Sequence, residues 1–216
     1  MDTASLATLI KSRRSVRRWQ PKPVPENLLV QAVEIATWAS NAGNFQNWRF
    51  YIILNEKTRN AIADAVQASA DKMAAWPEAQ KHGADAERWR GRVAFMRGAP
   101  ALIAVTVGEY QSLPDKILAE REKHDPEARI MRESRNSSVP RIQSAAAATA
   151  YLILALEQMG LGTVWMTGPC QAKPEIEKII GVPQGMDFVA LVPVGYPAET
   201  PQGQRKPVGE VCQIIR

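Results

Sequence analysis

The chain has 216 residues, of which 45% are hydrophobic and 23% are charged, and its formal net charge is +5. This length suits one domain with a core large enough to need no metal or disulfide. The small basic excess favours anionic ligands but is far below that of a nucleic-acid-binding tail, and no apolar run reaches the roughly 20 residues that span a bilayer.

The cysteines and histidines show no metal-binding pattern. Cys170 and Cys212 lack the spacing of a zinc site or of a disulfide framework, and His82 and His124 lie in polar stretches. The N-terminal residues lack the apolar segment of a secretory signal. We therefore expect reduced thiols, no metal site and a cytoplasmic protein.

The first part of the chain predicts two helices with a basic run between them. Apolar spacing indicates a helix from about Ala4 to Ser12, and Pro25 opens a second helix that continues to about Ala39. The run between them is Arg13-Arg14-Ser15, followed by Arg17 and Arg18. Guanidinium forks beside a hydroxyl suit a phosphate, although such runs are more often solvated faces.

A turn-rich polar segment, Asn41 to Asn47, precedes an aromatic and β-branched stretch, Trp48–Leu54, that predicts a buried strand. Further on, Glu109–Val139 carries many charges and little apolar periodicity. Because it is longer than an ordinary connection, we interpret it as a lid or a partner-binding excursion. The predicted elements between these segments are a helix over 57–75, a partly helical stretch over 76–98 and a core strand over 101–107.

In the last third, Pro140 opens an alanine-rich helix that continues to Met159, with Gly160 as its C-cap. Small residues along a helix face allow another helix to approach closely, inside the subunit or across a dimer. The later predicted elements are a strand over 162–166, a turn over 167–169, a helix over 174–180, a strand over 188–196 and an extended stretch over 211–215.

Strands and helices alternate less regularly than in a doubly wound fold, and the glycine-rich dinucleotide and P-loop motifs are missing. We therefore predict one α+β domain over residues 1–216. Within it, the lid covers about 109–139 and a C-terminal extension covers about 198–216.

Three separated features can be assembled into one binding site. The first is the basic run at Arg13, and the second is the turn from Asn41 to Gln46, whose amides suit a heteroaromatic edge. The third is the turn Met166–Pro169, where a glycine lets a backbone N–H approach a flat ligand closely. Arg205 could be a further phosphate ligand. Each feature is common alone, but their combination is less so.

The order of these segments resembles the FMN-dependent nitroreductase family over nearly the whole chain. The matching segments are Arg-Arg-Ser-x-Arg at 13–17, Asn-Ala-Gly-Asn-Phe-Gln-Asn-Trp-Arg-Phe at 41–50, Gly-Leu-Gly-Thr-Val-Trp-Met-Thr-Gly-Pro at 160–169 and Arg-Lys-Pro at 205–207. The resemblance implies a central mixed sheet flanked by helices, FMN as cofactor and NADH or NADPH as electron donor. It also implies a homodimer with two flavin sites at the subunit interface.

The resemblance further implies a role for each matching residue. Arg13 and Ser15 would hold the FMN phosphate, with Arg14 adjacent and Arg205 as a further ligand. Arg17 would face the flavin N1/O2 edge, where a cation stabilises the negative charge of the reduced ring. The other implied contacts are Asn41, Ala42, Gly43 and Asn44 from the neighbouring subunit, Gln46 on the pyrimidine side, Trp165, Met166 and Thr167 along one face, and the Gly168 backbone N–H near N5.

The implied activity is ping-pong reduction of a nitroaromatic, a quinone or a similar flat small-molecule acceptor. The flavin carries the chemistry, so no catalytic side chain is expected. The chain departs from many members, which have Pro-Ser in place of Ser40-Asn41 and Gln-Pro-Trp in place of Gln46-Asn47-Trp48. The missing proline removes a backbone restraint from this turn.

Several alternatives stay open. Other flavin chemistry on the same scaffold includes reductive dehalogenation, dehydrogenation and flavin fragmentation, and a flavin-binding protein without turnover is also possible. A basic nucleic-acid-binding protein is a further alternative, but the modest charge and the lack of interleaved aromatic residues argue against it. We expect neither a nucleic-acid partner nor a membrane association.

Overall fold

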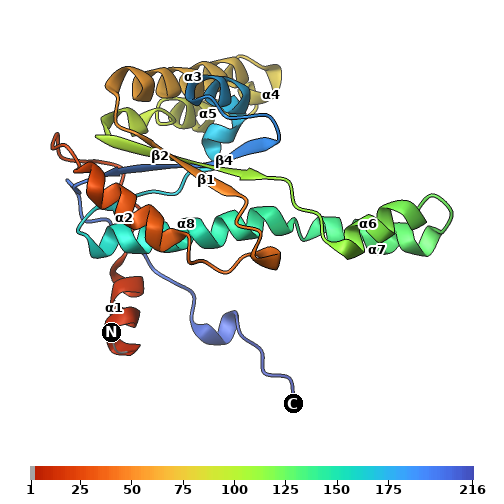
Figure 1. The fold of residues 1–216 in the computed structure, drawn as a ribbon. Coiled ribbons are helices and arrows are strands. Elements are labelled where there is room, and N and C mark those ends of the chain that lie inside the picture. The colour runs from red at the N-terminus through yellow and green to blue at the C-terminus, as the bar shows by residue number, and fades with distance from the viewer. Residues whose placement is uncertain (1–2) are drawn as a thin grey trace.

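The computed structural model describes residues 3–216 and shows a four-stranded sheet with helices on both faces (Figure 1). The strand order is β1 (Trp48–Ile53), β2 (Ala101–Gly108), β4 (Met186–Gly195) and β3 (Gly162–Thr163), and all neighbours are antiparallel. The one parallel pairing within residues 3–216 is an isolated bridge between Ser15 and Thr163, so the mixed character predicted for the sheet is confined to it. Residues 1 and 2 of the predicted domain lie outside the described residues.

The central strand β2 is buried along almost its whole length because both faces of the sheet are covered. Successive side chains of a strand point to opposite faces. Ile103 and Val105 accordingly pack into one hydrophobic cluster, and Leu102 and Ala104 pack into a second cluster on the other face. The continuous apolar run at 101–107 therefore builds two cores at once.

Helices α2 (Glu26–Ala36) and α8 (Pro140–Gln158) cover one face of the sheet (Figure 1). The buried side of α8 follows helical spacing through Ala145, Ala148, Leu152 and Leu156, and its small residues let α2 and β2 approach closely. The stretch Pro126–Gln158 is long and apolar enough to cross a membrane by length and composition alone, but its apolar half is this core helix.

The other face carries the second group of helices (Figure 1). They are α3 (Glu56–Ala74), α4 (Pro77–Gln80), α5 (Gly83–Arg90) and α9 (Lys173–Ile180). Gly181 ends α9 with a positive φ of 69°, the left-handed conformation in which glycine commonly terminates a helix.

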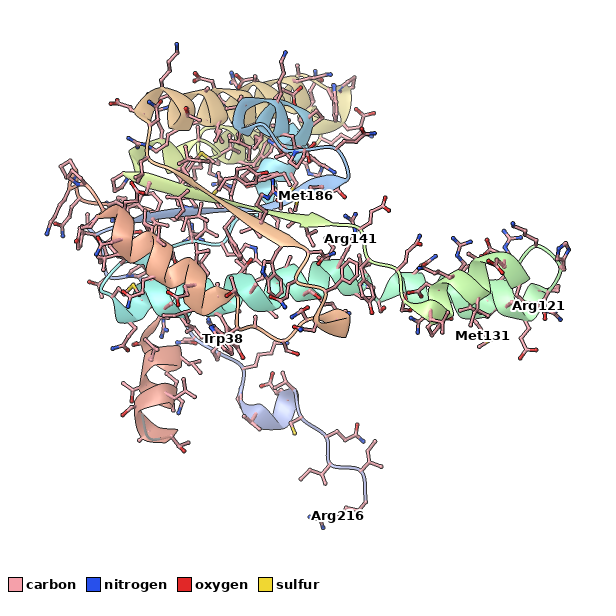
Figure 2. All side chains as sticks on the ribbon, in the orientation of Figure 1. Trp38, Arg121, Met131, Arg141, Met186 and Arg216 are labelled. Carbon is pink, nitrogen blue, oxygen red and sulfur yellow. The ribbon has the colours of Figure 1, made fainter. Side chains whose placement is uncertain are left out.

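Two helices from the predicted lid form a hairpin that projects from the body (Figure 1). They are α6 (Leu113–Arg121) and α7 (Pro126–Ser137), and Figure 2 places Arg121 and Met131 on this arm. Ser112 and Asp115 form a capping box at the start of α6, and Arg135 of α7 pairs with Asp115 at 2.7 Å. The hydrogen bonds from Arg135 and Ser112 hold the pKa of Asp115 well below its usual range. Caps and ion pairs therefore support helices that the weak apolar periodicity did not predict.

Both ends of the chain leave the body on the same side (Figure 1). Helix α1 (Thr3–Ser12) has no buried residue, and the C-terminal segment holds only the short helix η4 (Val208–Glu210) before it ends at Arg216 (Figure 2). The extended stretch predicted over 211–215 forms no strand and is exposed, because no neighbouring strand lies beside it within the described chain.

The strand predicted over 162–166 is shorter than expected. β3 includes only Gly162 and Thr163, and Met166 rejoins the sheet through an isolated bridge with Leu191. The turn after it is the short helix η3 (Gly168–Ala172). Helix α2 also ends earlier than predicted, at Ala36, where Thr37 caps it.

Candidate functional site

The loop that carries Arg13 to Arg18 is fixed to the edge strand β3. Ser15 bridges Thr163, and the Val16 backbone N–H donates to the Thr163 carbonyl at 2.9 Å. The Val16 side chain is buried against Gly162, where a Cβ would lie only 2.7 Å from Val16 Cγ2. Glycine at 162 therefore lets the loop approach the sheet closely.

Glu199 holds the other side of the same loop. Its Oε1 accepts the backbone N–H groups of Arg17 at 2.6 Å and Arg18 at 3.1 Å, and its Oε2 accepts Arg18 Nε at 2.9 Å. These hydrogen bonds lower the pKa of Glu199, the bond from the Arg17 backbone most strongly. Sequence reasoning left Arg18 without a role and missed Glu199, since the only available signal was an acidic residue shortly after the last strand.

Three guanidinium groups gather beside this loop without carboxylate partners. Arg14 donates to the Lys11 and Arg13 carbonyls, and its Nε is buried with no partner among residues 3–216. A Cβ added to Gly203 would lie 3.6 Å from Arg14 Nε and 3.8 Å from Arg205 Nη1, so these two guanidinium groups converge. Within the described chain, Arg13, Arg14 and Arg205 form no ion pair.

Glu157, near the end of α8, interacts electrostatically with Arg13 and Arg14. Burial raises the pKa of Glu157, and the two arginine charges lower it by less. It makes no ion pair with either arginine. Converging cations without a bonded counter-charge repel one another, and a bound anion relieves that repulsion. The cluster therefore suits a phosphate.

A pocket of about 550 Å³ brings Arg17 together with Met166 and Gly168. Trp165 packs against the hydrophobic cluster of Ile103 and Val105 on the opposite face of the sheet. Its indole Nε1 is buried and has no hydrogen-bond partner among residues 3–216. Thr167 is exposed and does not line the pocket. The structure therefore splits the predicted set Trp165–Gly168 between the two faces of the sheet. The other lining residues, which sequence reasoning missed, are Val66, Trp89, Arg92, Val93, Phe95, Pro169 and Gln171.

Four of the lining residues that sequence reasoning missed, Trp89, Arg92, Val93 and Phe95, lie in the charged, tryptophan-bearing stretch over 76–98. Its fold was predicted only as partly helical, so no face of it could be assigned to a ligand. The structure places Trp89 of α5 and Arg92, which follows this helix, in the same pocket lining as Gly168.

The predicted turn at 41–46 has a strained, well-anchored backbone. Gly43, Asn44 and Gln46 have positive φ angles of 60°, 52° and 48°. The Gln46 backbone N–H donates to Asn41 Oδ1 at 2.9 Å, and the Ala42 backbone N–H donates to Ser144 Oγ at 3.1 Å. Residues Gly43 to Gln46 are exposed, and the Gln46 side-chain amide donates to Asn44 Oδ1 at 3.1 Å.

The structure does not bring this turn to the basic cluster within one chain. The turn is anchored at Ser144 of α8, whereas Arg13 and Arg14 act on Glu157 of the same helix. The 13-residue separation corresponds to about 20 Å along the helix at 1.5 Å per residue. Within one chain, the turn and the basic cluster are therefore anchored near opposite ends of α8.

The described residues include no group of three or more histidine, cysteine, aspartate or glutamate side chains that could hold a metal ion. Cys170 and Cys212 are free thiols.

Comparison with solved structures shows the same architecture over the whole chain. A BluB-like flavoprotein from Clostridium difficile 630 is 25% identical and superposes with a TM-score of 0.85, covering 100% of both chains. An iodotyrosine deiodinase bound to FMN and 3-iodo-L-tyrosine is 27% identical, with a TM-score of 0.71 over 98% of this chain and 97% of the other.

Sequence comparison gives a consistent family. An NADH dehydrogenase from Thermus thermophilus is 30% identical over 210 residues, covering 89% of this chain and 86% of that protein. The model of the nitroreductase family matches residues 10–196. The chain therefore belongs to the nitroreductase family.

Proposed function

We propose that this protein is an FMN-dependent oxidoreductase that uses NADH or NADPH to reduce flat electrophilic acceptors such as nitroaromatics or quinones. The observation that carries the proposal is the cluster of unpaired guanidinium groups at Arg13, Arg14 and Arg205, which adjoins the loop leading to the pocket of Arg17 and Gly168. The similar deiodinase structure contains FMN, and the Thermus relative is named an NADH dehydrogenase.

The residues present fit FMN at both of its ends. The buried, unpartnered Nε of Arg14 and the converging Arg205 suit the phosphate, with Arg13 and the Ser15 hydroxyl beside them. Arg17 and the exposed backbone of Gly168 line the pocket that would receive the ring, and a Cβ at Gly168 would meet nothing within 4 Å. Glu199 keeps the loop between the two ends in place by accepting its backbone N–H groups.

The chemistry that FMN supplies when bound is acceptance of a hydride at N5 and delivery of two electrons to an acceptor in the same site. Arg17 contributes a fixed positive charge where negative charge develops on reduction. The Gly168 N–H orients the ring edge, and the apolar walls at Val66, Val93 and Phe95 limit access of water. Donor and acceptor use one pocket in turn, which gives a ping-pong sequence.

We also propose a homodimer in which the turn from Asn41 to Gln46 reaches the flavin of the neighbouring subunit. The separation of about 20 Å along α8 supports this, because it places the turn and the basic cluster of one chain near opposite ends of the helix. Exposed apolar side chains lie on the segments that leave the body and just after α2, where Trp38 is 82% exposed (Figure 2). The others in this set are Leu6, Ile10, Val211, Ile214 and Ile215. We also propose a cytoplasmic location, which the two free thiols support.

The proposed function is tested by anaerobic spectroscopy of the FMN-loaded protein. We expect the oxidised-flavin absorbance to bleach on addition of NADH or NADPH and to return on addition of a nitroaromatic or a quinone. A colourless protein that neither binds nor uses added FMN contradicts the proposal. A bound flavin that neither donor reduces contradicts the NAD(P)H-dependent activity.

Reductive dehalogenation is the second candidate, favoured by the structural match to the deiodinase. It is tested in the same experiment by adding 3-iodo-L-tyrosine to the reduced protein and measuring iodide release. Iodide release with a slow response to nitroaromatics would favour this second function over the first.

A further inference from the structure

We propose that Arg92 binds a negatively charged group on the acceptor, and that the acceptors of this protein are flat aromatic carboxylates. The inference rests on the proposed function because it places the acceptor in the pocket of Arg17, Met166 and Gly168. It goes further in naming the charge of the substrate and the residue that selects it.

Arg92 differs from the other arginines of its segment in having no partner. Arg88 pairs with Asp85, Arg90 pairs with Asp71 and Glu87, and Arg97 pairs with Asp64. Within residues 3–216, the Arg92 guanidinium makes no hydrogen bond or ion pair, and it lines the pocket. The segment therefore neutralises each neighbouring arginine and leaves one cation facing the site.

The rest of the pocket lining also favours an aromatic anion. Its walls are formed by Val66, Trp89, Val93 and Phe95, which suit a flat apolar ring. No carboxylate is among the described residues that line it, so both formal charges in the lining are positive. The Gln171 amide donates to the Val66 carbonyl at 3.4 Å and is partly committed.

Arg17 and Arg92 differ in the negative charge that each would meet in the loaded site. In the proposed function, Arg17 faces the flavin edge that becomes negative on reduction, which leaves the charge of Arg92 unmatched. A guanidinium fork and a carboxylate make two parallel hydrogen bonds. A carboxylate on the ring of the acceptor supplies both the charge and the geometry.

The test compares benzoate with its neutral isostere benzamide, titrated by calorimetry into the oxidised, FMN-loaded protein at two salt concentrations. Binding is read without turnover, so the result does not depend on any electron donor. The variants are Arg92→Gln, which removes the charge, and Arg92→Lys, which keeps it. Arg97→Gln is the matched control because Arg97 belongs to the same segment but is paired with Asp64.

We expect the wild-type protein to bind benzoate about tenfold more tightly than benzamide, with the preference weakening at high salt. Arg92→Gln should abolish the preference, Arg92→Lys should keep part of it, and Arg97→Gln should keep it fully. An unchanged preference in Arg92→Gln overturns the proposal, as does an equal loss for both ligands, which would show a purely steric wall.

A second measurement separates the acceptor from the phosphates of the donor. Arg92→Gln should lower the preference for benzoate over benzamide by a larger factor than it lowers the rate of anaerobic flavin reduction by NADH or NADPH, whereas Arg97→Gln should leave that rate unchanged within about twofold. A loss confined to reduction by the donor overturns the assignment of Arg92 to the acceptor. Failure of the proposed function itself has a different signature, because the wild-type flavin would then not bleach while benzoate binding is still measured.

Discussion

Replacing Gly162 by alanine tests how the fold holds the predicted phosphate-binding loop. An ideal Cβ at this position would lie 2.7 Å from Val16 Cγ2, 2.9 Å from Val16 Cβ and 3.0 Å from Val16 Cγ1. Since ordinary contact begins at 3.4 Å, the nearest Val16 atom must retreat by about 0.7 Å. Glu199 holds the loop on its other side, so Val16 has little freedom to move.

The expected cost has two parts. Overpacking of a buried contact lowers the free energy of unfolding by about 1–3 kcal/mol. A shift of Val16 also displaces its neighbours Ser15 and Arg17 from the cofactor. Loss of one charge-assisted hydrogen bond costs about 1.5–3 kcal/mol, which corresponds to roughly 10- to 150-fold weaker FMN binding.

The assay is titration of apoprotein with FMN, followed by quenching of flavin fluorescence, with urea unfolding measured in parallel. Gly98→Ala is the control, because a Cβ there meets nothing within 4 Å and its φ is not positive. In the double variant Gly162→Ala with Val16→Ala, the clash is removed, so FMN affinity should recover. If Gly162→Ala lowers stability while the Kd for FMN stays unchanged, the loop does not hold the phosphate and the reasoning is refuted.

Three further predictions concern the same loop and the start of α8. Arg13→Ala combined with Arg205→Ala should abolish FMN retention while circular dichroism shows an intact fold, whereas the exposed Arg121→Ala should change neither; unchanged FMN affinity would misplace the phosphate site. Glu199→Gln should lower the free energy of unfolding by about 1 kcal/mol at pH 7, because charge-assisted hydrogen bonds to the loop are lost. The pKa of Glu199 is lowered in the folded protein, so its contribution is present above the ordinary value near 4.5 and is lost as the pH falls through the folded value. The difference between the two proteins should therefore shrink below about pH 4.5, and a difference that grows on acidification would contradict this. Val139→Gly should raise the free energy of unfolding by about 1 kcal/mol in urea titrations, because Val139 has a φ of 42° that a β-branched residue adopts only with strain; a loss of stability would show that no strain is relieved.

Much of the fold follows directly from local sequence patterns. The continuous apolar run of β2 and the alanine-rich spacing of α8 predicted their elements within one or two residues. The hairpin of α6 and α7 was not predicted as helix, because caps and ion pairs such as Arg135 with Asp115 support it, and each helix buries only one apolar residue, Leu118 or Ala128. Such pairs depend on which helix packs beside which, and a single sequence does not specify that.

Only some residues of the candidate site could be predicted from local sequence patterns. The basic run at Arg13 and the glycine turn at Gly168 are short contiguous motifs, so the sequence shows them. The hydrogen bonds of Glu199 to the loop and the place of Arg92 in the pocket lining depend on how distant segments come together, and neither residue lies in a motif. Trp165 was grouped with Met166 by adjacency, but alternation in an extended segment sends the two side chains to opposite faces.

We propose that a complete site needs FMN and two copies of the chain. Native mass spectrometry of the FMN-loaded protein measures both at once. We predict an assembly of two 23.9-kDa chains that carries two FMN molecules. A monomer that carries one FMN would contradict the shared site, and a dimer that takes up no FMN would contradict the assignment of the arginine cluster to the phosphate.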